Sequence, residues 1–195
     1  MTVQTRITIL NKSKTLFAIN GYEGFSIRTL AKECGVGISS IYHFFGDKDD
    51  LLKELFDTTN RQLGVQRAML PKSSTASTML KRRVKFQFEH IEDVVFVLKY
   101  YLHFRPDFVR LHSGYLPAKA YLHIEEVLEY GIKTNEFTIE PSEIDKESKV
   151  IAHAINGFLL EYYPNPPQGR ELNTIVNSIH HFLIRSLNNK EVRMK

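Results

Sequence analysis

The chain has 195 residues, of which 43% are hydrophobic and 25% charged, and its formal net charge is +4. This composition is typical of a globular chain that buries a core in one domain or two small ones, and it argues against disorder. The mild positive charge permits a polyanionic partner without requiring one. The single cysteine, Cys34, excludes an internal disulfide framework and a four-cysteine zinc site. No apolar run has the length of a signal peptide or a membrane span, so we expect a cytoplasmic protein without a membrane partner.

Hydrophobic periodicity indicates helices along the whole chain. Apolar residues recur at steps of three and four, and no stretch alternates apolar and polar residues over the length of a strand. Clusters of Gly, Pro, Asn and Asp separate the periodic segments, and one such break, at Leu70 to Ser74, follows a long segment that begins at Asp47. The sequence therefore predicts an all-α fold of about nine helices.

Near the N-terminus the periodicity predicts one helix followed by two shorter ones. The first spans about Thr5 to Asn20 and ends before Gly21, whose positive φ suits a helix C-terminus. Ser26 is the predicted N-cap of the second helix, which Gly35 ends, and Gly37 is a weaker N-cap for the third. Two short helices joined by a tight glycine turn and braced by a third form a helix-turn-helix. The second short helix of such a unit enters the DNA major groove.

A fourth helix is predicted to begin at Asp47, where Asp47 and Asp50 resemble a capping box. Lys48 then lies in the first turn, where a cation gains nothing from the helix dipole. This unfavourable position indicates that Lys48 binds an anion such as a DNA phosphate, and the alternative is an ordinary solvated charge.

The run "ITILNKSKTLFAINGYEGFSIRTLAKECGVGISSIYHFFGDKDDLL" resembles the DNA-binding domain of the TetR family of bacterial one-component transcriptional regulators. The resemblance lies in the spacing of Ile-Leu and Leu-Phe, in Gly-Tyr, Ser-Ile-Arg-Thr-Leu-Ala and Gly-Val, and in Ile-Tyr-x-x-Phe followed by Asp-Lys-x-x-Leu. Gly37 and Gly46 depart from the family, which usually has Ser and often has Pro there. The resemblance covers about the first quarter of the chain, and the remaining helices agree in number and length.

The resemblance implies a helix-turn-helix DNA-binding domain at residues 1–48 and a helical effector-binding and dimerisation domain at 49–195, connected by the fourth helix. The implied function is a ligand-responsive regulator, most simply a repressor, that binds a pseudo-palindromic operator in double-stranded DNA as a homodimer. On binding a small, largely apolar or aromatic effector, the protein would release the operator. Activation of transcription, or DNA organisation without a ligand, stays open from the residues alone.

Seven residues are implied to contact DNA. Tyr42 and Lys48 would bind phosphates, Arg28 and Thr29 would approach the backbone, and base edges would meet Ser39, Ser40 and His43. Tyr42 has the alternative of a half-buried aromatic, and His43 that of a plain surface residue. The third helix has no Arg, Lys, Asn or Gln, so it predicts no bidentate contact with guanine or adenine.

The middle of the chain, from about residue 79 to 130, is rich in aromatic side chains. An apolar pocket is one use for such a cluster, and the resemblance also implies an effector site in this part. The predicted ligand-binding residues are Phe96, Tyr100, His103, Phe104, Phe108 and Tyr121. Aromatic residues at helical spacing also form ordinary cores, so a packed core is the alternative.

Two amphipathic helices are predicted near the C-terminus, on either side of the segment "PNPPQG". Long antiparallel helices of this kind can pair with their copies in a two-fold four-helix bundle. The predicted dimer-interface residues are Ile151, Ile155, Phe158, Tyr162, Leu172, Ile175, Ile179, Phe182 and Leu183. The alternative is that both stripes belong to the core of one chain.

Eight histidines raise the alternatives of a metal-sensing repressor and of an all-α metal-dependent enzyme. No Glu lies three residues before any histidine, and His-Glu-x-x-His is absent from the sequence. No turn marks a catalytic nucleophile either. We therefore expect no catalytic residue, no resident metal and no cofactor, and we do not expect an enzyme.

Overall fold

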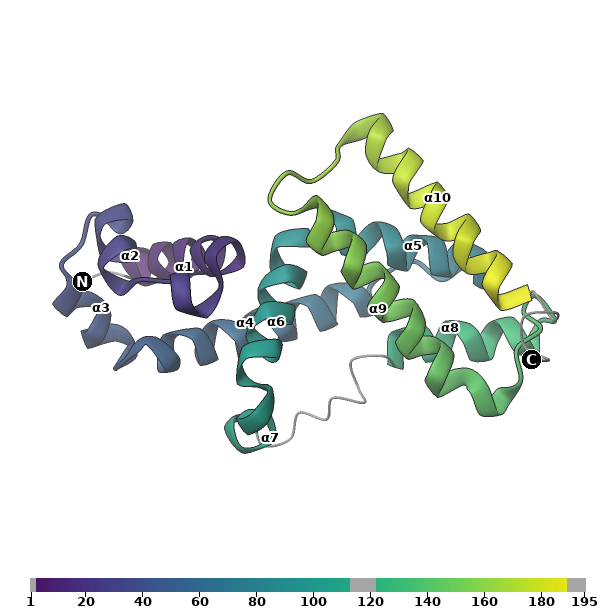
Figure 1. Cartoon of the computed structure of the whole chain (residues 1–195), viewed down its shortest axis with the longest axis horizontal. Helices are drawn as coiled ribbons and strands as arrows, with labels where there is room; N and C mark the ends of the chain where they lie inside the picture. Colours follow the sequence, from purple (N-terminus) through teal and green to yellow (C-terminus); the bar gives the residue numbers. More distant parts are fainter. Residues whose placement is uncertain (1–2, 113–121, 189–195) are drawn as a thin grey trace. The chain divides into compact units, whose positions relative to one another are not determined.

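The computed structural model describes residues 3–112 and 122–188. All secondary-structure elements in these two ranges are helices, so the predicted all-α class is confirmed (Figure 1). No helix in them combines the length and the apolarity that crossing a bilayer requires. The chain divides into two compact units. Unit 1 comprises Met1–Val65 and Glu92–Gly114, and unit 2 comprises Gln66–Ile91 and Tyr115–Lys195. The functional boundary after residue 48 stays a prediction.

Unit 1 contains the predicted helix-turn-helix segment and a later part of the chain. Its helices are α1 (Val3–Gly24), α2 (Ile27–Cys34), α3 (Ile38–Phe45), most of α4 (Lys48–Ala68), nearly all of α6 (Ile91–Phe104), the short 3-10 helix η1 (Arg105–Asp107) and α7 (Phe108–Leu111). α2 packs against both α1 and α3. Because nearly all of α6 belongs to this unit, the first three helices share their unit with residues that are distant from them in the sequence.

The regular part of α1 ends at Gly21, as predicted. Gly21 has φ 66° and ψ −172°, which interrupt the helix, although one further turn continues to Gly24. A lysine of α6 binds the carbonyls just before this break. Lys99 Nζ donates to Ala18 O at 2.6 Å and to Ile19 O at 3.2 Å. A positive charge at this end of a helix is favoured by the helix dipole, so Lys99 ties α6 to the end of α1.

The core of unit 1 is aromatic. Phe17 of α1, Phe56 of α4 and Tyr100 of α6 are almost completely buried. The rings of Phe56 and Tyr100 stack with centroids 4.5 Å apart. His112 is also buried and is hydrogen-bonded on both ring nitrogens, to Asp57 Oδ1 at 2.8 Å and to the Tyr100 hydroxyl at 3.0 Å. Burial raises the pKa of Tyr100, so its hydroxyl stays protonated and can donate.

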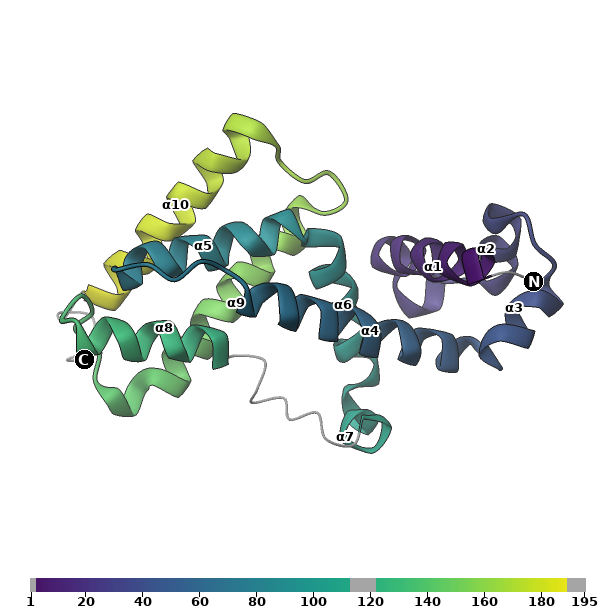
Figure 2. The same ribbon diagram turned by 180° about the vertical axis from the view of Figure 1, so that it is seen from behind.

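Unit 2 is a bundle built around α5 (Ala76–Glu89). Its other helices are α8 (Leu122–Lys133), the 3-10 helix η3 (Pro141–Glu143), α9 (Ile144–Tyr162) and α10 (Gly169–Asn188). α8, α9 and α10 all contact α5, and α8 also packs on α9 (Figure 1 and Figure 2). The core consists of the apolar stripes of these helices, among them Leu80, Val84, Ile124, Leu128, Ile155, Leu159, Val176 and Leu183.

A glutamate from the loop after α8 caps the N-terminus of α5. Glu136 Oε1 accepts from Ala76 N at 2.8 Å, and Glu136 Oε2 accepts from Ser77 N at 3.2 Å. Burial opposes the charged form, but these amide hydrogen bonds and one from the Thr134 hydroxyl lower the pKa of Glu136. The carboxylate therefore stabilises unit 2 in its ionised form.

We expect Glu136→Gln to lower the free energy of unfolding by about 1 kcal/mol at neutral pH, because the neutral amide is a weaker cap. The pKa of Glu136 is lower in the folded than in the unfolded chain. This contribution is therefore complete above the unfolded pKa and is lost as pH falls through the folded pKa. Denaturant unfolding across the acid range should show the difference between variant and wild type shrinking as pH falls. The control is Glu129→Gln on the exposed face of α8, and an equal effect of both would contradict the capping role.

Candidate nucleic-acid interface

The second helix begins as its local sequence predicts. Ser26 is extended, with φ −119° and ψ 125°, and its Oγ accepts from Thr29 N at 3.4 Å. Ile27, Leu30 and Ala31 form the buried stripe of α2. Ser26 as N-cap is confirmed, and the apolar stripe fixes which face of α2 remains on the surface.

The turn between α2 and α3 depends on a glycine. Gly35 has φ 65° and ψ 31°, the left-handed conformation that glycine adopts without a side-chain clash. Gly35 N donates to Lys32 O at 3.2 Å, and Val36 N donates to Ala31 O at 3.0 Å, so the last carbonyls of α2 are satisfied. The predicted end of the second helix at Gly35 is confirmed.

The third helix starts at the predicted N-cap and buries one side only. Gly37 is extended, and its carbonyl accepts from Ser40 N at 3.0 Å. Ile41 and Phe45 are 1% and 6% exposed and attach α3 to unit 1. With these two side chains buried, the opposite face of α3 is free to meet a groove.

Most of the predicted DNA-contacting side chains lie on the surface of α2 and α3. Arg28 and Thr29 are exposed on α2, and Ser39, Tyr42 and His43 are exposed on α3. Tyr42 is 46% exposed. Ser40 is half-buried. The structure thus brings six of the seven residues together on two helices in contact, and their contacts with DNA stay a prediction.

Lys48, the seventh residue, is held by the protein itself. Its Nζ donates to Tyr22 O at 2.7 Å and lies 3.8 Å from the centroid of the Tyr22 ring. The Tyr22 hydroxyl donates to Asp49 Oδ1 at 2.6 Å, and this hydrogen bond raises the pKa of Tyr22 to about 12. Lys48 is therefore not a freely solvated charge. An ammonium has donors left over after one hydrogen bond, and its contact with a phosphate stays a prediction.

Two residues of this surface were not singled out from the sequence. Tyr22 fixes Lys48 on one side, and its ring stacks on His103 of α6 at 3.8 Å between centroids. Ile38, in the first turn of α3, is 39% exposed although it is apolar. Its position four residues before Tyr42 places it on the same helix face, and this spacing is the signal that could have identified it.

The residues predicted to bind an effector lie mostly in the core of unit 1. Phe96, Tyr100 and Phe108 are at most 2% exposed and pack on one another. Phe104 is half-buried and His103 is on the surface. Tyr121 lies outside the described residues. The packing favours the alternative of an ordinary core for the three buried rings, and the ligand contacts stay a prediction.

The residues predicted to form the dimer interface divide into three groups. Ile151, Ile155, Ile179 and Leu183 are buried in the core of unit 2 within one chain. Tyr162, Leu172 and Ile175 are half-buried. Phe158 and Phe182 remain 39% and 61% exposed. Fewer of the predicted residues on α9 and α10 are therefore exposed for contact with a second copy than the sequence indicated.

The histidines do not assemble into a metal site within the described ranges. Nowhere in residues 3–112 and 122–188 do three or more His, Cys, Asp or Glu side chains lie together as a metal ion would require. His180 Nε2 is hydrogen-bonded to Ser77 Oγ at 3.0 Å, and burial lowers the pKa of His180. The His180 ring thus forms a hydrogen bond between α10 and α5.

Comparisons with known proteins agree with this geometry. The family model described as "Bacterial regulatory proteins, tetR family" matches residues 9–55. The HTH-type transcriptional repressor AcnR of Corynebacterium efficiens is 40% identical over 53 residues, which are 27% of this chain and 28% of AcnR. The chain thus matches little more than a quarter of that relative's length.

Solved structures match over nearly the whole chain. The transcriptional regulator FadR of Bacillus subtilis, in complex with stearoyl-CoA, has a TM-score of 0.67 at 20% identity over 92% of this chain and 97% of FadR. A transcriptional regulator of Saccharomonospora viridis, in complex with choline, has a TM-score of 0.74 at 18% identity over 97% of this chain and 100% of that one. At such identities the likeness shows the fold, and both matched proteins are described as transcriptional regulators. Residues 9–55 are thus similar to the tetR family of bacterial regulatory proteins, and the chain as a whole shares the fold of these solved regulators.

Proposed function

We propose that the protein is a ligand-responsive transcriptional regulator that binds a pseudo-palindromic DNA operator as a homodimer. The observation that carries this proposal is the unit formed by α2, the turn at Gly35 and α3, whose outer face carries exposed polar side chains. A regulator of this kind acts on DNA in the cytoplasm. We propose repression, because the relative AcnR is described as a repressor.

In the proposed complex the exposed face of α3 lies in the major groove. Ser39 and His43 are positioned to bond base edges, and Ile38 offers an apolar contact for a thymine methyl group. Arg28, Thr29 and Tyr42 would contact the phosphate backbone, which fixes the register of the protein on the duplex. A cationic residue is not needed on α3 itself, because its neighbours supply the phosphate contacts.

Selection from random duplex DNA tests the proposed function directly. The purified full chain is incubated with the library at about 0.15 M salt, which screens weak nonspecific binding. We expect enrichment of sequences with two inverted half-sites whose centres lie roughly one helical turn, about 34–36 Å, or a multiple of it apart. An unenriched pool after repeated rounds would contradict sequence-specific binding.

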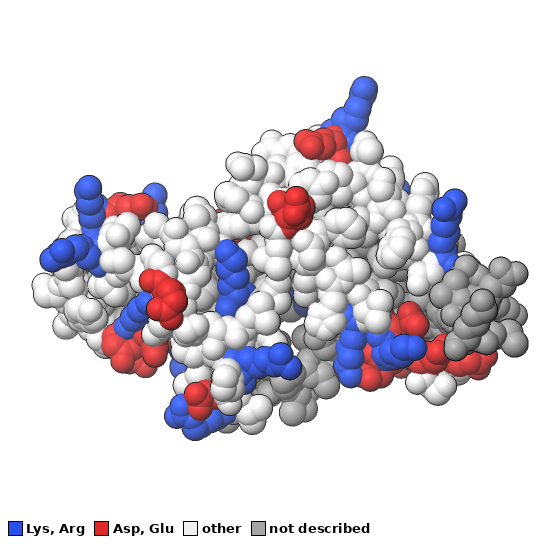
Figure 3. Space-filling view, in the orientation of Figure 1, with Lys and Arg blue, Asp and Glu red and all other residues white. Residues whose placement is uncertain are grey.

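Dimerisation is proposed to use the outer faces of α9 and α10. Val150 and Phe158 are exposed on α9, and Phe182 is exposed on α10. On the face that Figure 3 shows, the surface over α10 and the second half of α9 carries few charged side chains, whereas charges gather where α9 begins. Large exposed apolar side chains on a weakly charged surface are typical of interfaces. A two-fold axis through this surface would also supply the second reading helix.

We expect Phe182→Glu to weaken the dimer by roughly 30-fold or more, because each two-fold interface would bury two unpaired carboxylates in place of two rings. Sedimentation equilibrium over a range of concentrations measures the change. Val109→Glu, at an exposed apolar residue of α7, is the control and should leave the dimer intact. A wild-type chain that sediments as a monomer at all concentrations would contradict the proposed homodimer.

The proposed regulation is release of the operator on binding a small effector. Two regulators with this fold were solved with stearoyl-CoA and with choline, which supports a ligand for this chain as well. An effector shifts the protein away from its DNA-binding state only through a difference in affinity for the two states. We propose an organic molecule with a largely apolar part, in line with the prediction from the sequence.

A further inference from the structure

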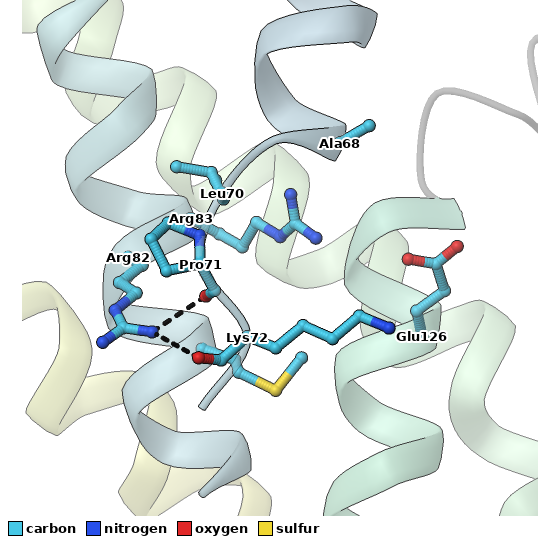
Figure 4. A pocket seen from close by; sticks show the side chains of 8 residues that line it. Ala68, Leu70, Pro71, Lys72, Arg82, Arg83 and Glu126 are labelled. Atoms are coloured by element: carbon cyan, nitrogen blue, oxygen red, sulfur yellow. Dashed lines mark hydrogen bonds between the residues drawn. The ribbon is translucent and has the colours of Figure 1, made fainter. Parts of the chain in front are cut away.

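A cavity of about 390 Å³ lies in unit 2, between the end of α4, the linker that follows it, α5 and α8 (Figure 4). Part of its lining is apolar and comes from Leu70 and Pro71 of the linker and Met79 of α5. This volume is at the lower end of the range of ligand sites in proteins. None of the described residues predicted from the sequence to bind an effector, which are Phe96, Tyr100, His103, Phe104 and Phe108, lines this cavity.

The polar part of the lining is dominated by cations. Among the described lining residues, three are cations, Lys72, Arg82 and Arg83, and one is a carboxylate, Glu126. Figure 4 shows Arg83 extending from α5 into the space below the end of α4, and Lys72 reaching toward Glu126 of α8. Among the described residues, no carboxylate lies within the 4 Å of an ion pair from either side chain.

The two arginines have different tasks. Arg82 turns toward the linker, and its Nη1 donates to Pro71 O at 2.8 Å and Lys72 O at 3.1 Å, which fixes the rim of the cavity. Arg83 is half-buried, and its Nη1 donates to Arg67 O at 2.6 Å at the end of α4. Burial lowers the pKa of Arg83. A guanidinium has several further N–H donors, so Arg83 can hold this carbonyl and an anion together.

We infer that this cavity binds a small amphipathic anion, whose carboxylate or phosphate group is held by Arg83 and Lys72 while its aliphatic part contacts Leu70, Pro71 and Met79. An anion would give the half-buried Arg83 a directly bound counter-charge, in addition to the Glu126 carboxylate, which acts on it only from beyond ion-pair distance. A neutral apolar molecule would add no negative charge to a lining in which cations outnumber carboxylates. The inference rests on the proposed function in one respect, because such an anion is the natural effector of this regulator.

Calorimetric titration of the full chain with octanoate, octyl phosphate and octanol tests the inference. We expect at least one of the two anions to bind at least about tenfold more tightly than octanol, which has the same alkyl chain without the charge. The ratio between octanoate and octyl phosphate then identifies the head group that the site prefers. Equal binding of all three compounds, or no saturable binding of either anion up to about 10 mM, would overturn the inference.

Variants assign the effect to the cavity. Lys72→Met and Arg83→Met should each remove about tenfold or more of the preference for the anion. Because Arg83 also holds the end of α4, Lys72→Met on the exposed linker tests the site even if Arg83→Met unfolds. Arg185→Met, at an exposed arginine of α10, is the matched control. Anion binding unchanged in Lys72→Met and in folded Arg83→Met would place the anion elsewhere and overturn the inference.

Operator binding measured on the same preparations separates the two proposals. If sequence-specific DNA binding is intact and the anions show no preference, the inference about the cavity fails alone. If the anions bind as expected and no DNA sequence is preferred, the proposed function fails and the cavity remains an anion site.

Discussion

Arg28→Ala/Tyr42→Ala is expected to bind the selected operator at least about 100-fold more weakly than wild type, with an unchanged melting temperature. Both side chains are exposed, on α2 and α3 respectively, so their removal leaves the core of unit 1 intact. Each lost contact with DNA costs about 1–3 kcal/mol, and a dimer would lose each contact twice. Fluorescence anisotropy with labelled operator DNA measures the loss.

The salt dependence of the same titrations distinguishes phosphate contacts from base contacts. Each lost phosphate contact should reduce the slope of log affinity against log salt by roughly one. Arg61→Ala, at an exposed arginine of α4 in the same unit, provides the control with an equal loss of charge. If Arg61→Ala weakens binding as much as the double variant does, net charge explains the effect and the surface of α2 and α3 is not the interface.

Gly131→Ala is expected to destabilise unit 2 by about 1–3 kcal/mol. A Cβ at this position would lie 2.1 Å from Cδ2 and 2.4 Å from Cε2 of the buried Phe137 ring. The ring cannot move away freely, because Glu136 N and Phe137 N both donate to Gly131 O, at 2.8 and 3.1 Å. The clash therefore outweighs the gain of about 1 kcal/mol that alanine normally brings to a helix.

Gly64→Ala is the matched control, since Gly64 also lies inside a helix but no atom approaches its added Cβ within 4 Å. This variant should gain up to about 1 kcal/mol in its own unit, through helix propensity alone. Chemical denaturation followed by circular dichroism measures both variants. A Gly131→Ala variant as stable as wild type would show that the loop carrying Phe137 is not held in place.

The start of α2, its end and the start of α3 could be predicted because they depend on neighbouring residues. Ser26 supplies a side-chain acceptor, Gly35 adopts a positive φ, and Gly37 starts the next helix in an extended conformation. Such capping interactions join residues that are only a few positions apart, so they can be predicted without knowing the tertiary fold. Ser26 and Gly35 also belong to the motifs that resemble the TetR family, whereas Gly37 departs from them. Most residues of the candidate interface could therefore be named from the sequence.

The division of apolar residues between core and surface could not be predicted. Periodicity shows which residues share a helix face, but it does not show what that face packs against. Tyr100 contacts Phe17 and Phe56, which come from α1 and α4, so the buried rings of this stripe on α6 pack in the core of unit 1. On α9, Ile155 is buried and Phe158 is exposed, although both lie on one apolar stripe in the sequence.

Two polar features also depend on the tertiary fold. Lys48 is held by Tyr22, which lies more than twenty residues earlier, on α1. This tertiary contact compensates for the unfavourable position of the cation at the start of α4, and the sequence did not show it. The cavity in unit 2 combines the linker after α4 with side chains of α5 and α8. Only the folded chain brings these segments together, and no spacing in the sequence indicates an anion site there.

The most direct test of DNA reading by α3 is an anisotropy titration of wild-type protein with the selected pseudo-palindrome and with the same duplex in which one half-site is scrambled. At about 0.15 M salt we expect two protomers to bind the intact site, with an affinity for the scrambled site lower by at least about 100-fold. Equal affinity for both duplexes would contradict sequence-specific binding as a dimer.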